Sequence, residues 1–168
     1  VTHRDMKPAN VILLETGATV KVADFGIARI ETSELTQAGT VLGTPSYMSP
    51  EQLGRTATDI DRRTDVWSLG VTLFEIVVGR RPFEAPTREG LYRAILTTEP
   101  PKASSFVAGI PKDFDVVIAT ALEKDRNRRY ATALDFADDL ARILDQQPIR
   151  ARPANLLTKI VRWSSRNR

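Results

Sequence analysis

The chain has 168 residues, with 24 Lys or Arg, 21 Asp or Glu and a formal net charge of +3. Its length and its hydrophobic share of 42% suit one globular domain and exclude wholesale disorder. With no Cys and a single His, the sequence excludes disulfides, thiolate zinc sites, cysteine nucleophiles and multi-histidine metal sites.

The first predicted element is a β-hairpin over residues 11–23. Two short apolar runs, Val11–Leu14 and Val20–Ala23, flank the turn residues Glu15–Gly17. Residues 29–48 follow without a helical or strand period and are rich in Thr, Ser and Gly. A loop of that length in a compact domain is usually functional, so we expect a small hairpin followed by a functional loop.

Helices are predicted for most of the remaining chain. Ser49-Pro50-Glu51 indicates a short helix with an N-cap serine, a proline at the first helical position and an early acidic residue. The pattern from Thr64 to Val78 has no polar face, so we expect a helix buried on all sides and ended by Gly79. Three further helices are predicted over 87–98, 112–124 and 132–144. The predicted fold is therefore α+β and mainly α-helical.

Three motifs stand in order before the long apolar helix. They are His3-Arg4-Asp5-Met6-Lys7-Pro8-Ala9-Asn10, Asp24-Phe25-Gly26, and Gly43-Thr44-Pro45-Ser46-Tyr47-Met48-Ser49-Pro50-Glu51. An isolated Asp-Phe-Gly triplet is a weak signal. All three motifs in this order, followed by Asp65-Val66-Trp67-Ser68-Leu69-Gly70, are not a chance arrangement.

The side chains of the first two motifs suit phosphoryl transfer. That reaction needs a carboxylate to orient the acceptor hydroxyl and cations to neutralise the phosphate charge. Asp5 can orient the hydroxyl, and Lys7 can reach the transferring phosphate. Asn10 and Asp24 offer the hard oxygen ligands that Mg²⁺ takes alongside phosphate. A solvated charged loop is the alternative, but the spacing and the intervening hairpin favour a two-Mg²⁺ nucleotide site.

Together these motifs resemble those of the eukaryotic-type protein kinase family, most closely its bacterial serine/threonine members, over residues 1 to about 148. The resemblance implies a protein-kinase C-lobe whose hairpin carries the catalytic and metal-binding loops. It implies transfer of the ATP γ-phosphate to Ser/Thr hydroxyls of protein substrates, with Mg²⁺. The segment 43–51 would shape the protein-substrate groove. The implied roles are catalysis for Asp5, Lys7 and Thr44, ATP binding for Lys7, Asn10, Ile12 and Asp24, and metal binding for Asn10 and Asp24.

The resemblance also implies architectural roles. Glu51 is similar in position to a glutamate that pairs with an arginine, here Arg129. Asp65 resembles the aspartate that braces the catalytic loop from the central helix, and His3 and Phe25 match residues that stack in the regulatory spine. Considered alone, His3 would be a core histidine, and we expect a structural role for it.

Regulation by phosphorylation is expected within the loop 29–48, which resembles an activation segment. Thr40 is the best-placed acceptor and Thr36 the second, while Arg4, beside the catalytic aspartate, could pair with the added phosphate. The alternative is that these threonines reflect only the composition of the loop.

The family's ATP-holding N-lobe lies before its catalytic loop, and no G-x-G-x-x-G or G-x-x-x-x-G-K-[ST] motif substitutes for it here. We therefore expect a C-lobe fragment, opening at Val1 without an initiator Met, that alone neither binds ATP tightly nor transfers phosphate. Without the helix that precedes the catalytic loop in the family, the 64–78 helix should also leave an apolar patch exposed.

A noncatalytic kinase-derived binding module is the alternative function, and the intact metal ligands favour the enzyme over it. Antibiotic phosphotransferases share the Asp…Asn…Asp logic but lack the other motifs.

Residues 149–168 form a basic tail with six Lys or Arg and no acidic residue, whereas residues 1–148 sum to −3. Apolar residues at helical spacing among the basic ones predict an amphipathic, juxtamembrane-like stretch that binds an anionic membrane surface. These apolar residues are Leu156, Leu157, Ile160, Val161 and Trp163. The protein would then be cytoplasmic, at the inner face of the plasma membrane. A solvated helix and a nucleic-acid contact are alternatives; with one aromatic residue in the tail, no nucleic-acid partner is expected.

Overall fold

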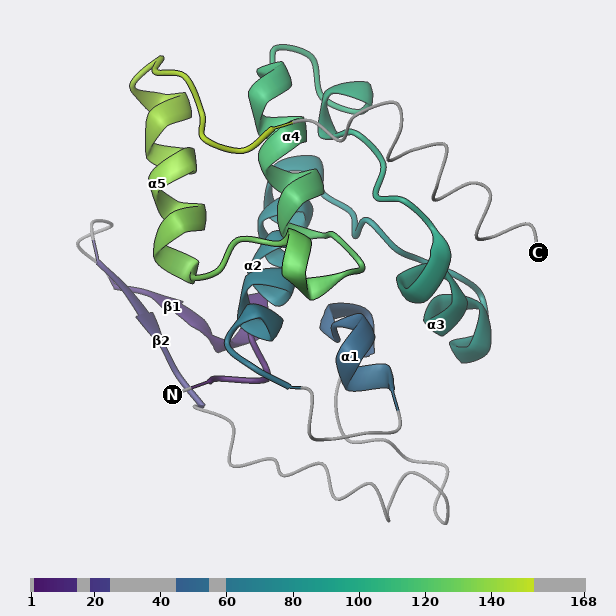
Figure 1. Cartoon of the computed structure of the whole chain (residues 1–168). Coiled ribbons are helices and arrows are strands. Elements are labelled where there is room, and N and C mark those ends of the chain that lie inside the picture. The colour runs from purple at the N-terminus through teal and green to yellow at the C-terminus, as the bar shows by residue number, and fades with distance from the viewer. Residues whose placement is uncertain (1, 15–18, 25–44, 55–59, 153–168) are drawn as a thin grey trace.

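A helical body with a small hairpin at its side is seen in a computed structural model of the chain (Figure 1). The structure describes residues 2–14, 19–24, 45–54 and 60–152. Strands β1 (Val11–Leu13) and β2 (Val20–Val22) pair antiparallel, which confirms the predicted hairpin. The helices are α1 (Pro50–Leu53), α2 (Arg63–Val78), α3 (Arg88–Thr97), α4 (Lys112–Ala121) and α5 (Ala133–Leu144). Short 3-10 turns lie at Pro8–Asn10, Pro45–Tyr47, Ala103–Ser105 and Arg126–Arg128.

The helix ends follow the capping residues. Ser49 begins α1 through a capping box with Gln52, as its predicted N-cap role requires. The side chains of Thr87 and Thr132, before α3 and α5, each accept a hydrogen bond of 3.1 Å from a backbone N–H three residues on. Gly79 ends α2 with a left-handed φ of 78°, a conformation that glycine adopts without a steric cost.

The core lies around α2, which runs through the middle of the body with α5 on one side and α3 on the other (Figure 1). Trp67 of α2 stacks on Phe83, with ring centroids 5.6 Å apart and planes 8° from parallel. Gly70 permits close packing against α4, because a Cβ at this position would lie 3.0 Å from the Cβ of Ala121. The large side chains with less than 2% exposure include Trp67, Phe74, Ile95, Ile118, Leu122, Val66, Val71 and Val117.

Two expectations for the helices need correction. Helix α2 is not buried on all sides: Ile76 is 65% exposed, because the described elements pack on the opposite side of the helix. Helix α4 ends at Ala121 rather than Lys124, since the chain turns there and the Glu123 carbonyl accepts a hydrogen bond from Arg129. Within the described ranges, no helix is both long and apolar enough to cross a membrane.

Asp139 attaches the segment after α5 to the body. Its carboxylate is fully buried, and it accepts hydrogen bonds from the backbone N–H groups of Arg150 and Ala151 at 2.7 and 2.9 Å. The hydroxyl of Tyr130 donates a third at 2.9 Å. The chain reverses after α5 at Gln146, whose φ is 55°. Residues 149 and 151 therefore pack against the same core as the helices.

Candidate active site

Asp5, Lys7 and Asn10 lie together in one hydrogen-bonded loop. Lys7 Nζ donates to Asp5 Oδ2 at 2.7 Å. Asn10 Nδ2 donates to the backbone carbonyl of Asp5 at 2.7 Å and to its Oδ2 at 3.2 Å. Asn10 is buried, whereas 42% of the Asp5 side chain is exposed. The arrangement thus fixes the carboxylate from the protein side and leaves it accessible to an incoming hydroxyl.

The backbone of this loop is held by Asp65, in the first turn of α2. Asp65 Oδ2 accepts from the N–H of His3, and Oδ1 accepts from the N–H of Arg4, both at 2.8 Å. Gln52 of α1 donates through Nε2 to the carbonyl of Arg4 at 2.9 Å. Arg4 has a φ of 67°, rare for a residue other than glycine, and these bonds hold it there. The predicted bracing role of Asp65 is confirmed.

His3 joins the loop to the hairpin. It is 4% exposed, and its Nδ1 accepts a 3.3 Å hydrogen bond from the N–H of Asp5. Because Nδ1 accepts, the neutral ring carries its proton on Nε2, which lies 2.9 Å from the carbonyl of Ala23 and donates to it. The structural role expected for His3 is confirmed. Phe25, its expected stacking partner, lies outside the described residues.

Asp24 is the residue after Ala23, whose carbonyl accepts this hydrogen bond from His3. The N–H of Ala23 donates to the carbonyl of Asn10 at 2.9 Å, so the hairpin brings the two predicted metal-binding loops together. Asp24 has a φ of 52°, a second left-handed residue at the site. Asn10 uses Nδ2 for both hydrogen bonds to Asp5. A carboxylate and an amide oxygen are ligands that suit Mg²⁺. In the part of the chain that the structure describes, no three His, Asp or Glu side chains converge to hold a metal ion by themselves.

The remaining predicted site residues are placed only in part. Ile12, on β1, is 47% exposed, and the hairpin also exposes other apolar side chains. Arg4 is exposed at the edge of the loop. Thr36, Thr40 and Thr44 lie outside the described residues.

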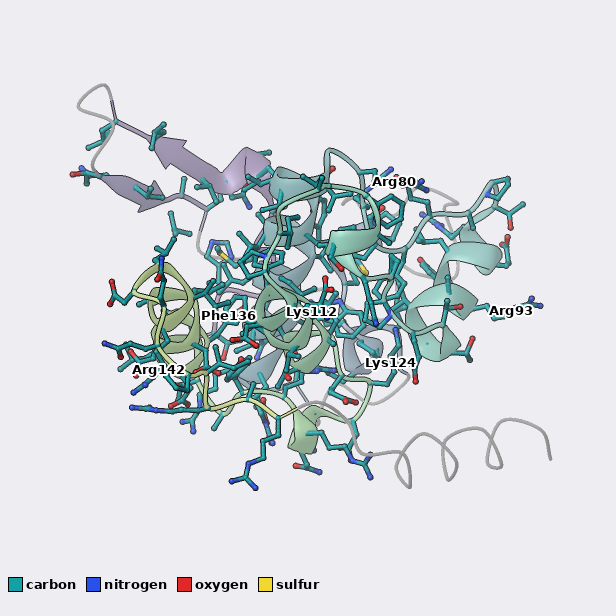
Figure 2. The ribbon with its side chains drawn as sticks, turned by 90° about the horizontal axis from the view of Figure 1, so that it is seen from above. Arg80, Arg93, Lys112, Lys124, Phe136 and Arg142 are labelled. Atoms are coloured by element: carbon teal, nitrogen blue, oxygen red, sulfur yellow. The ribbon has the colours of Figure 1, made fainter. Side chains whose placement is uncertain are left out.

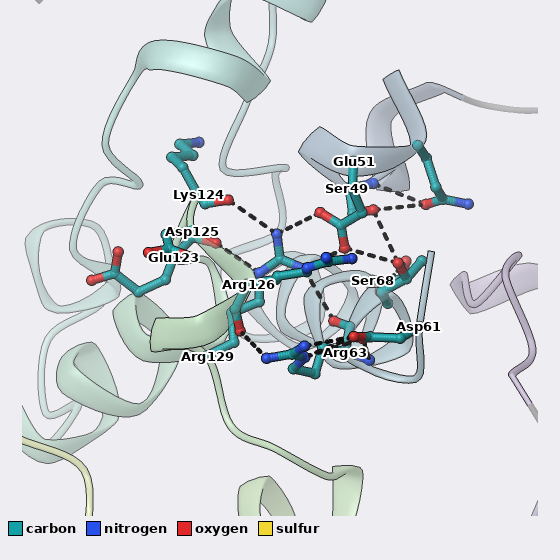
Figure 3. Close-up of polar contacts among 12 residues, drawn as sticks. Ser49, Glu51, Asp61, Arg63, Ser68, Glu123, Lys124, Asp125, Arg126 and Arg129 are labelled. Atoms are coloured by element: carbon teal, nitrogen blue, oxygen red, sulfur yellow. Dashed lines mark hydrogen bonds and ion pairs between the residues drawn. The ribbon is translucent and has the colours of Figure 1, made fainter. Parts of the chain in front are cut away.

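Glu51 and Arg129 form the buried ion pair that the family resemblance implies (Figure 3). Two parallel contacts of 2.6 and 2.7 Å join the guanidinium to the carboxylate, and the two side chains are 9% exposed or less. Thr64 donates to the same carboxylate at 2.8 Å. Burial alone would raise the pKa of Glu51, but the hydrogen bond and charge of Arg129 outweigh it and lower that pKa. The pair fixes α1, and with it Gln52, beside the start of α2.

Helix α2 and Arg81, just beyond it, hold the segment Pro45–Tyr47 through contacts that sequence reasoning missed. The Tyr47 hydroxyl donates to Glu75 Oε2 at 2.5 Å, and the Ser68 hydroxyl donates to the Tyr47 carbonyl at 2.9 Å. Arg81, just after the helix, donates to the Ser46 hydroxyl at 2.7 Å. The sequence signal for the first of these contacts was Glu75, an acidic residue that stands among apolar neighbours in the second half of the run 64–78.

Tyr47 is expected to ionise only near pH 12. Burial, and then the hydrogen bond and charge of Glu75, raise the pKa of Tyr47 from its ordinary 10.0 to about 12. Because this pKa is higher in the folded chain than in the unfolded chain, the stabilisation is complete below about pH 10 and is lost as the pH rises toward 12. Spectrophotometric titration of tyrosine ionisation tests this, with Tyr47→Phe as the control. This variant should lack the ionisation step near pH 12, and a variant that kept that step would contradict the assignment.

Comparison with known proteins adds independent information. The family model described as "Protein kinase domain" matches residues 1–140. Serine/threonine-protein kinase PknB of Mycobacterium leprae is 40% identical over 153 residues, covering 90% of this chain and 24% of that protein. Probable serine/threonine-protein kinase PknB of Bifidobacterium longum is 37% identical over 170 residues, covering 99% and 24%. Serine/threonine-protein kinase PknL of Mycobacterium tuberculosis is 35% identical over 147 residues, covering 87% and 36%. The chain thus spans between about a quarter and about a third of the length of these relatives.

Proposed function

Since this chain belongs to the protein kinase family, we propose that it carries the catalytic part of an ATP-dependent protein serine/threonine kinase. The reaction is transfer of the ATP γ-phosphate to Ser or Thr hydroxyls of protein substrates. The observation that carries this proposal is the hydrogen-bonded set of Asp5, Lys7 and Asn10. Their geometry supplies an accessible carboxylate beside a cation and an amide, which is what phosphoryl transfer requires.

Residues 1–148 are proposed to form the C-lobe of a kinase domain, which would hold ATP together with an N-lobe. The mainly helical body around α2, with one small hairpin, supports this assignment. The exposed apolar side chain of Ile12 on β1 supports a role for the hairpin as one wall of the adenine site. This chain alone is expected to bind ATP weakly and to transfer no phosphate.

Each polar residue of the site has a distinct task. Asp5 orients the acceptor hydroxyl and takes its proton as the oxygen attacks the γ-phosphorus and the bond to the ADP leaving group breaks. Lys7, which now pairs with Asp5, can also contact the transferring phosphate, and Thr44 is the third residue to which the family resemblance gives a catalytic role. Asn10 and Asp24 would hold Mg²⁺, which when bound neutralises phosphate charge.

The test is a transfer assay on the protein translated from the complete gene. With labelled ATP and Mg²⁺, label is expected on Ser and Thr of a protein acceptor, while the 168-residue chain alone transfers none. Robust transfer by the chain alone, abolished by Asp24→Ala, would contradict the need for an N-lobe. Peptide binding without any transfer by the complete protein would instead favour the noncatalytic binding module.

Phosphorylation at Thr40, and secondarily at Thr36, is proposed to regulate the site through Arg4. The exposed Arg4 side chain, on a backbone fixed by Asp65, supports this role because it is a preset cationic partner for a phosphate. Mapping of phosphate by mass spectrometry on the complete protein tests it. Consistent absence of phosphate from both threonines would refute the proposal.

The tail 149–168 is proposed to bring the kinase to an anionic membrane surface on the cytoplasmic side. The support is its six basic residues and the apolar spacing of the sequence. Co-sedimentation with anionic liposomes should be lost when the six basic residues are replaced by glutamine. Unchanged binding by that variant would contradict an electrostatic contact.

A further inference from the structure

Two neighbouring arginines after α2 make contacts of different kinds. Arg81 reaches inward: its Nη1 donates to the hydroxyl of Ser46 at 2.7 Å, and Ser46 is only 4% exposed. Arg80 stays at the edge of the molecule (Figure 2), where it pairs with Glu84 at 3.0 Å and lies 5.5 Å over the ring of Phe106. Of the two arginines, only Arg81 therefore contacts the segment Pro45–Tyr47.

The Arg81 contact is a charge-assisted bond to a buried hydroxyl. Arg81 Nε also lies 3.7 Å from Glu84 Oε1, and the Arg81 side chain is 34% exposed. The Glu84 carboxylate therefore balances the positive charge of Arg81, which is partly shielded from solvent. The positive charge of Arg81 also acts on the neighbouring Tyr47, lowering its pKa against the stronger opposing effects of burial and Glu75. The guanidinium thus lies within electrostatic reach of two consecutive residues of the segment. A bond of this kind is stronger than one between neutral groups.

We propose that Arg81 is a positioning residue that fixes the segment Pro45–Tyr47 through Ser46 and so sets the affinity for the protein substrate. This inference rests on the proposed function and on the expectation that the segment 43–51 shapes the protein-substrate groove. Removal of the guanidinium would leave the buried Ser46 hydroxyl without this donor. The loop of Asp5 is held separately by Asp65, so the chemical step should change little.

The test uses the protein translated from the complete gene. Arg81→Ala is expected to raise KM for a protein substrate about tenfold, the factor that corresponds to loss of a charge-assisted hydrogen bond. The values of kcat and of KM for ATP should change less than about twofold. Arg81→Lys should recover part of the loss, and Arg80→Ala, the matched control, should leave all three constants unchanged.

The pairing with Ser46 is tested by a double-mutant cycle. Ser46→Ala deletes one oxygen and should raise the same KM, and the double variant with Arg81→Ala should be no worse than either single variant. If Arg81→Ala does not fold, Ser46→Ala and Arg81→Lys carry the measurement. Additive effects of the two substitutions would overturn the proposed pairing.

Hydrogen exchange of this chain provides a readout that does not depend on activity. Backbone amides of residues 46–48 should exchange faster in Arg81→Ala than in the parent, whereas Arg80→Ala should leave their exchange unchanged. Unchanged exchange in Arg81→Ala would overturn the anchoring role. An active parent whose KM is indifferent to Arg81 would overturn this inference alone, whereas a complete protein with no transfer would overturn the proposed function as well.

Discussion

Replacement of Asp5 with asparagine is expected to lower the rate of phosphate transfer by about a thousandfold in the protein translated from the complete gene. The amide cannot take the proton of the acceptor hydroxyl. It also changes the Oδ2 acceptor that now receives hydrogen bonds from both Lys7 and Asn10. Because 42% of the Asp5 side chain is exposed, stability should change little. The measurement is the initial rate at saturating ATP, beside the thermal midpoint of the same sample.

A matched control separates this effect from a general loss of charge. Asp113 lies exposed in the first turn of α4, away from the loop of Asp5. Asp113→Asn should keep the parental rate. If Asp5→Asn kept a rate within tenfold of the parent, the proposed catalytic role would be wrong.

Replacement of Arg129 with methionine is expected to lower the free energy of unfolding by about 3–5 kcal/mol, because it leaves the Glu51 carboxylate buried without its cation. The guanidinium also donates to the carbonyl of Glu123 at 2.7 Å and lies 5.1 Å from the centroid of the Trp67 ring (Figure 3 shows its polar neighbours). Several contacts would thus be lost together. Urea denaturation of parent and variant measures the difference.

The double variant Glu51→Gln with Arg129→Met provides the control. It removes both charges and should be more stable than Arg129→Met alone, since the unpaired carboxylate is gone.

The pH dependence of the free energy of unfolding gives a second check. The pKa of Glu51 is lower in the folded chain, so its contribution is complete above the ordinary value of 4.5 and is lost as the pH falls through the folded pKa. A double variant with the same acid sensitivity as the parent would contradict this account.

Sequence patterns predicted the local structure well, and the spaced motifs predicted which residues form the site. Both have physical reasons. A cap such as Ser49 acts on amides within its own turn, so its effect is visible in a few letters. The braces Asp65 and Glu51–Arg129 were found through resemblance, not periodicity, because their partners lie far apart in the chain. The exposure of Ile76 could not be read from its own helix, since it depends on which other elements cover that side.

The contacts that remained hidden join a side chain to a distant backbone amide or hydroxyl. Arg81 and Ser46 are 35 positions apart, and neither residue type is unusual where it stands. Asp139 resembles any acidic residue of an amphipathic helix until the chain turns back on it. Pairings of this kind depend on the tertiary path, which single-sequence patterns do not encode.

The bonds of Asp139 have a mechanical consequence for the segment that follows α5. A load that pulls on the chain after Ala151 would act on the amides of Arg150 and Ala151, and their two hydrogen bonds to one carboxylate would resist it together. The load would then pass to α5 and, through Tyr130, to the turn that precedes this helix. Arg152 is therefore the first residue after the two anchored amides.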